Sequence, residues 1–206
     1  MKATMKTLSA SLICCFISTI QMYGENIQRP ESENYVKGVE ALNEGNPEAA
    51  YTYLNAEINE HPDNGYAHCY MALICNFCND TKLALKALNS SLELIPEADT
   101  EYRSFAHYSR GVLLTNLKMW EHAEADLNEA IRLNPEDVEN YKSRAQLYFE
   151  TERYEESLDD LTRALKLDSK ADVNDLVLQL MAVAPTSEFM ERITATYQQL
   201  DQVTIH

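Results

Sequence analysis

Residues 104–137 are SFAHYSRGVLLTNLKMWEHAEADLNEAIRLNPED, and residues 138–171 are VENYKSRAQLYFETERYEESLDDLTRALKLDSKA. The two stretches carry the same kinds of residue at equivalent places, 34 positions apart. Small residues and a large leucine recur in this way at Gly111 and Ala145, Ala123 and Ser157, and Leu127 and Leu161. A 34-residue period of small and large apolar positions predicts stacked helix pairs, each packed on its neighbour, rather than one closed core.

The same pattern occurs twice more upstream. Its markers are Gly38, Ala50, Leu54 and Pro62 in one copy, and Ala72, Ala84, Leu88 and Pro96 in the next. The step from Ala84 to Ala123 is 39 rather than 34, so five residues are inserted near Glu97–Glu101. Glu and Ala are good helix formers. The insertion either lengthens the loop or starts the first helix of the third copy early, and on these residues we expect the early start.

Two Asn-Pro pairs indicate where helices begin. Asn46-Pro47 and Asn134-Pro135 each place an N-cap residue before a proline at the first helical position. Glu136 and Asp137 add acidic residues to the expected first turn after Asn134. Both pairs therefore predict a helix that starts at the proline.

Residues 31–171 resemble the tetratricopeptide repeat (TPR) family on these markers. The match is best in the third copy, at His107, Arg110-Gly111, Leu114, Ala123, Leu127, Ala130 and Pro135. The resemblance implies an all-α, right-handed superhelical solenoid of antiparallel helix pairs. Its four repeats are expected at residues 31–64, 65–98, 104–137 and 138–171. Residues 172–202 are expected to form a divergent capping hairpin, because the last unit of a solenoid has one face in water.

The first 24 residues are typical of an export signal. Lys2 and Lys6 precede an uncharged run that is short for a membrane span, and Gly24 precedes the first acid, Glu25. We expect cleavage after Gly24, with residues 25–30 as a linker, and a periplasmic or envelope-associated protein. Two alternatives stay open: an uncleaved anchor, and a bacterial lipoprotein acylated at Cys14 or Cys15.

The net charge of −16 disfavours nucleic acid and anionic lipid as partners. We expect membrane contact only through the N-terminal segment, if it is uncleaved or lipidated. The expected partner is a protein or a peptide.

The resemblance implies that this partner binds along the first helices of the repeats, which line the inner wall. The expected groove residues are Tyr35, Val39, Tyr66, Tyr70, Asn76, Phe77, Phe105, Tyr108, Val112, Asn116, Lys142 and Phe149. Rings supply contact area and amides can bond to a peptide backbone. The alternative is that these rings pack against neighbouring helices. The basic residues with which some relatives hold a chaperone's C-terminal carboxylate are absent from the matching places.

No Gly-rich phosphate loop, HExxH or GxSxG motif is present. We therefore expect a non-catalytic binding scaffold without a cofactor or metal. The alternative function is a thiol-redox or metal-binding accessory protein that uses Cys75 and Cys78, with Cys69 and His68 nearby. This CxxC falls at the end of a predicted helix, where the dipole does not lower a thiol pKa. A purely structural solenoid that self-associates through its ends is a third possibility.

Overall fold

The structure is a computed structural model that describes residues 27–183 and 186–203. These residues contain ten helices and no strand, which confirms the all-α prediction. The predicted signal segment, residues 1–24, lies outside the described residues. None of the helices in the described part of the chain has the length and apolar character that a membrane span requires.

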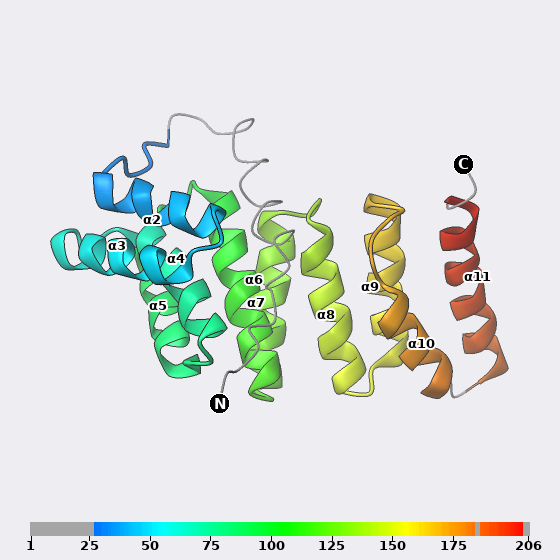
Figure 1. The fold of residues 1–206 in the computed structure, drawn as a ribbon. Coiled ribbons are helices and arrows are strands. Elements are labelled where there is room, and N and C mark those ends of the chain that lie inside the picture. Colours follow the sequence, from blue (N-terminus) through cyan, green and yellow to red (C-terminus); the bar gives the residue numbers. More distant parts are fainter. Residues whose placement is uncertain (1–26, 184–185, 204–206) are drawn as a thin grey trace, which may run out of the picture. The chain divides into compact units, whose positions relative to one another are not determined.

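The chain forms two compact units, and the boundary between Ala106 and His107 falls inside helix α6. The first unit contains α2 (Glu33–Asn43), α3 (Pro47–Glu60), α4 (Gly65–Phe77), α5 (Thr81–Leu94) and the start of α6 (Thr100–Asn116). The second contains the rest of α6, then α7 (Trp120–Leu133), α8 (Val138–Glu150), α9 (Tyr154–Leu167), α10 (Asn174–Val183) and α11 (Ser187–Val203). Consecutive helices pair as hairpins in each unit, as α2 with α3, α4 with α5, and α8 with α9 (Figure 1).

Each hairpin is closed where its smallest residue meets the other helix. A Cβ atom added to Gly38 would lie 2.6 Å from Cγ of Leu54, and one added to Gly111 would lie 2.7 Å from Cγ of Leu127. In the fourth hairpin the hydroxyl of Ser157 donates to the carbonyl of Ala145 at 2.8 Å. These contacts confirm the predicted close crossing of the two helices.

A polar contact lies beside this crossing in three of the hairpins. Arg110 donates two hydrogen bonds to Asp126, at 2.7 and 2.8 Å, and 34 residues later Arg144 likewise donates two to Asp160. The equivalent place in the first hairpin holds Lys37, whose ammonium lies 5.8 Å from the ring centre of Tyr53. The repeats therefore share the position of this contact, although its chemistry differs between them.

One of the two predicted helix starts is correct. Asn46 caps α3, and its side chain accepts from the amide of Ala49 with Pro47 in the first turn. Asn134 does not cap α8. It is the C-cap of α7, and α8 begins at Val138 with Asp137 as its N-cap. The residue before a proline is disfavoured in the helical region, so Asn134-Pro135 suits the end of one helix as well as the start of another.

The insertion near 97–101 starts α6 early, as predicted, but not at its first residue. The helix begins at Thr100, while Glu97 and Ala98 form a turn. Asp99 sets the boundary, because its carboxylate accepts from the backbone amide of Tyr102 at 3.3 Å. The insertion therefore lengthens α6 at its start and places a buried carboxylate there.

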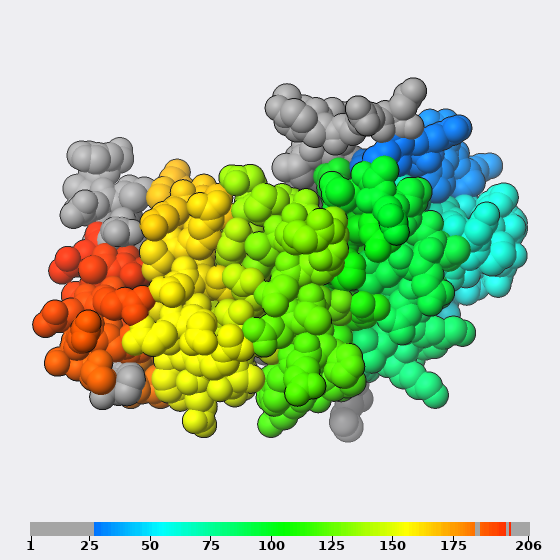
Figure 2. Space-filling view, turned by 180° about the vertical axis from the view of Figure 1, so that it is seen from behind, coloured from blue at the N-terminus to red at the C-terminus, as the bar shows by residue number. Residues whose placement is uncertain are grey.

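Helices α10 and α11 pack on α9 at the end of the second unit, in agreement with the expected capping hairpin. Val177, Leu180, Phe189 and Ile193 are almost fully buried there. In the view from behind, the orange-to-red surface of this hairpin adjoins that of α9 (Figure 2). The apolar face that α9 would otherwise expose is thereby covered.

We expect Gly111→Val to lower the free energy of unfolding by about 1–3 kcal/mol, because Leu127 fills the space that the side chain would need. Urea unfolding followed by circular dichroism measures the change. Ala125→Val, on the exposed side of α7, introduces the same branched side chain in a helix. An equal loss in both variants would contradict the close-crossing explanation.

Burial opposes ionisation of Asp126, but hydrogen bonds from Arg110 and His107 outweigh it and hold the pKa of this carboxyl below its usual value. A lowered pKa stabilises the fold above the ordinary aspartate pKa of about 3.9, and this stabilisation is lost as the pH falls through the folded value.

Asp126→Asn is therefore expected to cost about 1–3 kcal/mol at neutral pH. It should cost less near pH 3, because the stability that a lowered pKa supplies decreases once the pH falls below the ordinary aspartate value. Denaturant titrations at both pH values check this, with Glu121→Gln as the matched control, because Glu121 is an exposed carboxylate of the same helix. A cost independent of pH would contradict the assignment.

Candidate functional site

Four tyrosines form one cluster in the first unit, which we call the tyrosine cluster: Tyr35, Tyr66, Tyr70 and Tyr102. Each is at most 7% exposed. The ring centres of Tyr66 and Tyr102 lie 4.8 Å apart, edge to face, and Tyr70 lies 6.1 Å from Tyr35 and 6.2 Å from Tyr102. The predicted groove residues Tyr35, Tyr66 and Tyr70 are thus brought together, but they pack on one another and on the early start of α6.

The hydroxyls of this cluster are paired inside the protein. The Tyr70 and Tyr102 hydroxyls lie 2.9 Å apart, and the Tyr66 hydroxyl donates to Asp99 at 2.9 Å. Burial raises the pKa of all four phenols above its ordinary value. The cluster is therefore a neutral, hydrogen-bonded core at physiological pH.

The other predicted groove residues of the first unit keep some exposure. Val39, Phe77 and Phe105 are partly buried, and Asn76 is exposed at the end of α4. In the second unit Val112 and Phe149 are partly buried and Asn116 is exposed. Phe149 packs on Tyr154, with 5.7 Å between ring centres.

Two of the predicted wall residues of the second unit, Tyr108 of α6 and Lys142 of α8, both lie near Glu139 of α8. Burial, together with the nearby carboxylate of Glu139, raises the pKa of Tyr108 to about 12. The same Glu139 accepts a hydrogen bond from the ammonium of Lys142 at 2.8 Å. Lys142 thus lies on α8 with its charge paired by a residue of the same helix.

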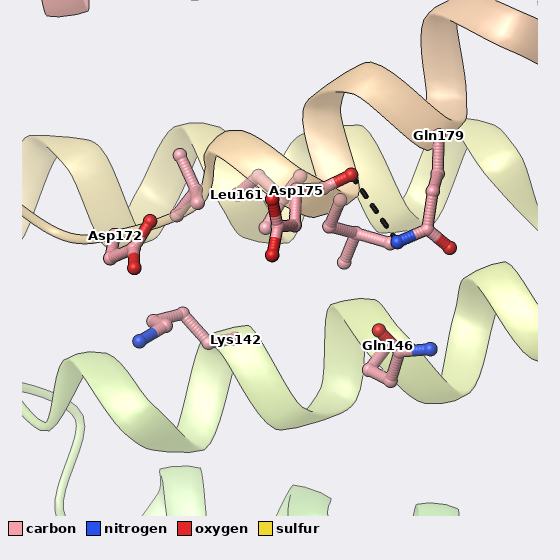
Figure 3. Close-up of a pocket in the computed structure, with 8 residues that line it drawn as sticks. Lys142, Gln146, Leu161, Asp172, Asp175 and Gln179 are labelled. Carbon is pink, nitrogen blue, oxygen red and sulfur yellow. Dashed lines mark hydrogen bonds between the residues drawn. The ribbon is translucent and has the colours of Figure 1, made fainter. Parts of the chain in front are cut away.

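Lys142 also lines a cleft of about 180 Å³ between α8 and α10. Lys142 and Gln146 from α8 face Asp172, Asp175 and Gln179 across the opening (Figure 3). The remaining lining residues are the buried, apolar Leu161, Val173 and Leu176. The cleft therefore combines an apolar floor with a polar rim on two helices of the same unit.

The rim of this cleft is rich in hydrogen-bond acceptors. Asp172 and Asp175 are exposed. The amide groups of Gln146 and Gln179 donate to Glu150 and to the carbonyl of Asp175, and their own oxygens are acceptors. A ligand that donates hydrogen bonds or carries positive charge fits such a rim.

Most cleft residues were not among the sequence-predicted groove residues. The apolar positions Val173 and Leu176 were assigned to the capping hairpin, and both are buried in its core. Nothing in the spacing of Asp172, Asp175 and Gln179 shows that they face α8, because this depends on the angle at which α10 crosses α9. The sequence offered one signal for this cleft, which is that Asp172 and Asp175 stand beside the apolar positions Val173 and Leu176.

The three described cysteines lie along and just after α4. Cys69 and Cys75 are buried, and Cys78 is the exposed C-cap of the helix; all three are free thiols. Burial raises the pKa of Cys69 to about 12, and burial with the nearby charge of Asp80 raises that of Cys75. Among the described residues, no group of three or more potential His, Cys, Asp or Glu ligands is gathered closely enough to hold a metal ion.

Residues 106–137 and 139–170 match the family model described as the tetratricopeptide repeat. Tetratricopeptide repeat protein 6 of Homo sapiens is 24% identical over 143 residues, which cover 69% of this chain and 26% of that protein. The lipoprotein NlpI homolog of Haemophilus influenzae is 31% identical over 87 residues, which cover 42% of this chain and 28% of that protein. The chain thus spans about a quarter of the length of these curated relatives.

Two solved structures share the fold. MamA from Desulfovibrio magneticus RS-1, from residue 41 to its end, superposes with a TM-score of 0.67 at 19% identity, covering 84% of this chain and 96% of that one. YrrB, described as a TPR protein with an unusual peptide-binding site, gives a TM-score of 0.60 at 20% identity, covering 71% and 73%. Residues 106–137 and 139–170 are thus tetratricopeptide repeats, and the described chain has the fold of paired helices that these structures share.

The three described thiols are expected to differ in reactivity. Near pH 8 a thiol with a pKa of about 12 is ionised in roughly one molecule in ten thousand. Alkylation with iodoacetamide, followed by peptide mass spectrometry, should therefore modify Cys78 first, Cys75 much more slowly and Cys69 only after unfolding.

Modification in urea serves as the control, since all three cysteines should then react alike. Rapid joint loss of Cys75 and Cys78 as a disulfide under mild oxidation would instead favour the thiol-redox alternative.

Proposed function

We propose that this chain is a protein-interaction scaffold, and that its cleft between α8 and α10 binds an extended segment of a partner protein. The observation that carries this proposal is the acceptor-rich rim over an apolar floor. An aliphatic side chain of the partner would lie on Leu161 and Leu176, where it is removed from water. The amide oxygens of Gln146 and Gln179 would accept from the partner's backbone N–H groups.

The charge of the cleft favours a segment that carries Lys or Arg. Lys142 is neutralised by Glu139, while Asp172 and Asp175 form no salt bridge with any described residue. Their field adds to that of a chain with a net charge of −16. Such a field speeds the approach of a basic partner and disfavours an acidic one.

We propose that several of the sequence-predicted wall residues also contact the partner protein, each within its own unit. In the second unit these are Tyr108, Val112, Asn116, Lys142 and Phe149; in the first they are Val39, Asn76, Phe77 and Phe105. The description of YrrB as having a peptide-binding site is consistent with peptide binding by this fold.

We also propose that the protein is exported and works in the periplasm or at the cell envelope. Support comes from the signal-like sequence of residues 1–24 and from the name of the Haemophilus influenzae relative, a lipoprotein. N-terminal sequencing of the protein from its native source tests cleavage after Gly24, for which the first residue found should be Glu25. Recovery of the intact N-terminus would contradict cleavage.

The cleft is tested with the Asp172→Asn and Asp175→Asn double variant. Peptides selected for wild-type binding from a random 12-residue library are titrated by fluorescence anisotropy. We expect the variant to bind them about tenfold more weakly, because each lost carboxylate removes a charge-assisted contact. Wild-type affinity should also fall as salt rises.

The matched control is Glu188→Gln with Glu191→Gln, which removes the same charge from exposed positions of α11. Undiminished binding by the aspartate variant would exclude the cleft, and a library that yields no binder would count against the scaffold function.

A further inference from the structure

The side chain of Arg29 joins the segment before α2 to the rest of the first unit. The guanidinium of Arg29 donates from Nε to Asp99 at 3.2 Å, and from Nη2 to Asp99 at 3.3 Å and to Glu101 at 3.0 Å. Its central carbon lies 4.7 Å from the ring centre of Tyr102. A fork of two donors on a carboxylate with an aromatic face alongside is the geometry in which proteins recognise arginine.

The residues that receive Arg29 are held in place without it. Asp99 is 1% exposed, and its carboxylate also accepts from the Tyr66 hydroxyl and from the backbone amide of Tyr102. The Tyr102 ring is in turn fixed by its contacts with Tyr66 and Tyr70. The site is therefore preorganised, and loss of Arg29 would leave a buried carboxylate without its cation, which is costly.

The site also carries more negative charge than Arg29 balances. Asp99 and Glu101 oppose one guanidinium, and both carboxylates come from the five-residue insertion that the other repeats lack. The neighbouring Arg103 is not paired with these carboxylates, because its guanidinium donates to the carbonyls of Leu92 and Ile95. An incoming cation would thus meet a site that is already acidic.

The segment that fills the site is held by side chains, among which Ile27 and Pro30 are partly buried, and not by backbone hydrogen bonds. In the described structure no backbone hydrogen bond ties residues 27–31 to the rest of the chain, and the first one in this region joins Val36 to Ser32. Gln28 and Glu31, which flank Arg29 and Pro30, are exposed. The Arg29 side chain itself keeps 25% exposure. Its release needs no helix to unfold.

We propose that Asp99, Glu101, Tyr66 and Tyr102 form an arginine-binding site, which Arg29 occupies within the chain and from which an arginine-bearing segment of a partner protein displaces it. Residues 27–31 then act as a latch over the tyrosine cluster. The partner must supply a guanidinium, because an ammonium cannot bond to two oxygens of Asp99 while lying flat on the Tyr102 ring. The proposal rests on the scaffold function, but not on the cleft between α8 and α10.

The test removes the Arg29 side chain from the site and offers the site an arginine on an added peptide. The probe is a fluorescein-labelled peptide with the sequence of residues 25–33, ENIQRPESE, and a second peptide carries Lys in place of Arg. Full-length Arg29→Ala should bind the arginine peptide at least about tenfold more tightly than the wild type, because the site is no longer occupied from within. Adding Glu101→Gln should reverse most of this gain.

Arg192→Ala is the matched control, since it removes one arginine that pairs with Glu155 and Asp159 in the other unit. It should bind the peptide no better than the wild type. Equal binding of the Lys peptide, or no gain in Arg29→Ala with an unchanged circular dichroism spectrum, would overturn the proposal. Cleft variants leave this result untouched, so failure here is distinct from failure of the cleft.

A measurement on the wild type covers the case in which Arg29→Ala does not fold. The Arg29 Nε–H resonance is followed by NMR while unlabelled arginine peptide is added. A progressive shift that the Lys peptide does not cause supports displacement. An Arg29 resonance unchanged by peptide up to about 10 mM, several times the effective concentration of a short tether, would overturn it.

Discussion

The contact between a glycine on one helix and a leucine on the other sets how closely the two helices of a hairpin approach each other. Gly38 and Gly111 leave no room for a Cβ beside Leu54 and Leu127, so the two helix backbones approach closely along that line. Close approach buries Ala50 and Ala123 completely on the opposite helix. Since packing at this density tolerates little change in volume, the crossing constrains the direction of the other side chains on the hairpin.

The repeats share this crossing but differ in the chemistry that surrounds it. Lys37 over Tyr53, Arg110 with Asp126, and Arg144 with Asp160 occupy equivalent places. A partly buried carboxylate is favourable there only because an arginine fork satisfies both of its oxygens. The scaffold therefore depends on apolar contacts for its geometry, and it uses polar pairs where the two helices leave space.

The five-residue insertion changes what the first unit can do. It extends the start of α6, which brings Tyr102 onto Tyr66 and Tyr70 and sets Asp99 against Arg29. Aromatic residues that a simple repeat would present to a partner are thereby covered from within the chain. In the second unit, the capping hairpin instead leaves an open, acidic cleft beside α8. The two units thus offer acidic sites of different construction.

The sequence by itself determined the helix pairs, their 34-residue period, the close crossings and the place of the insertion, because these follow from local spacing and residue size. It also predicted Lys142 as a binding residue, and Lys142 lines the cleft between α8 and α10. The tertiary structure decided the rest. It showed that Tyr35, Tyr66 and Tyr70 pack inward, that Asp137 rather than Asn134 caps α8, and that Asp172, Asp175 and Gln179 face Lys142. Each of these depends on how one helix or hairpin is rotated against the next, and such a rotation results from many long-range contacts that no local pattern records.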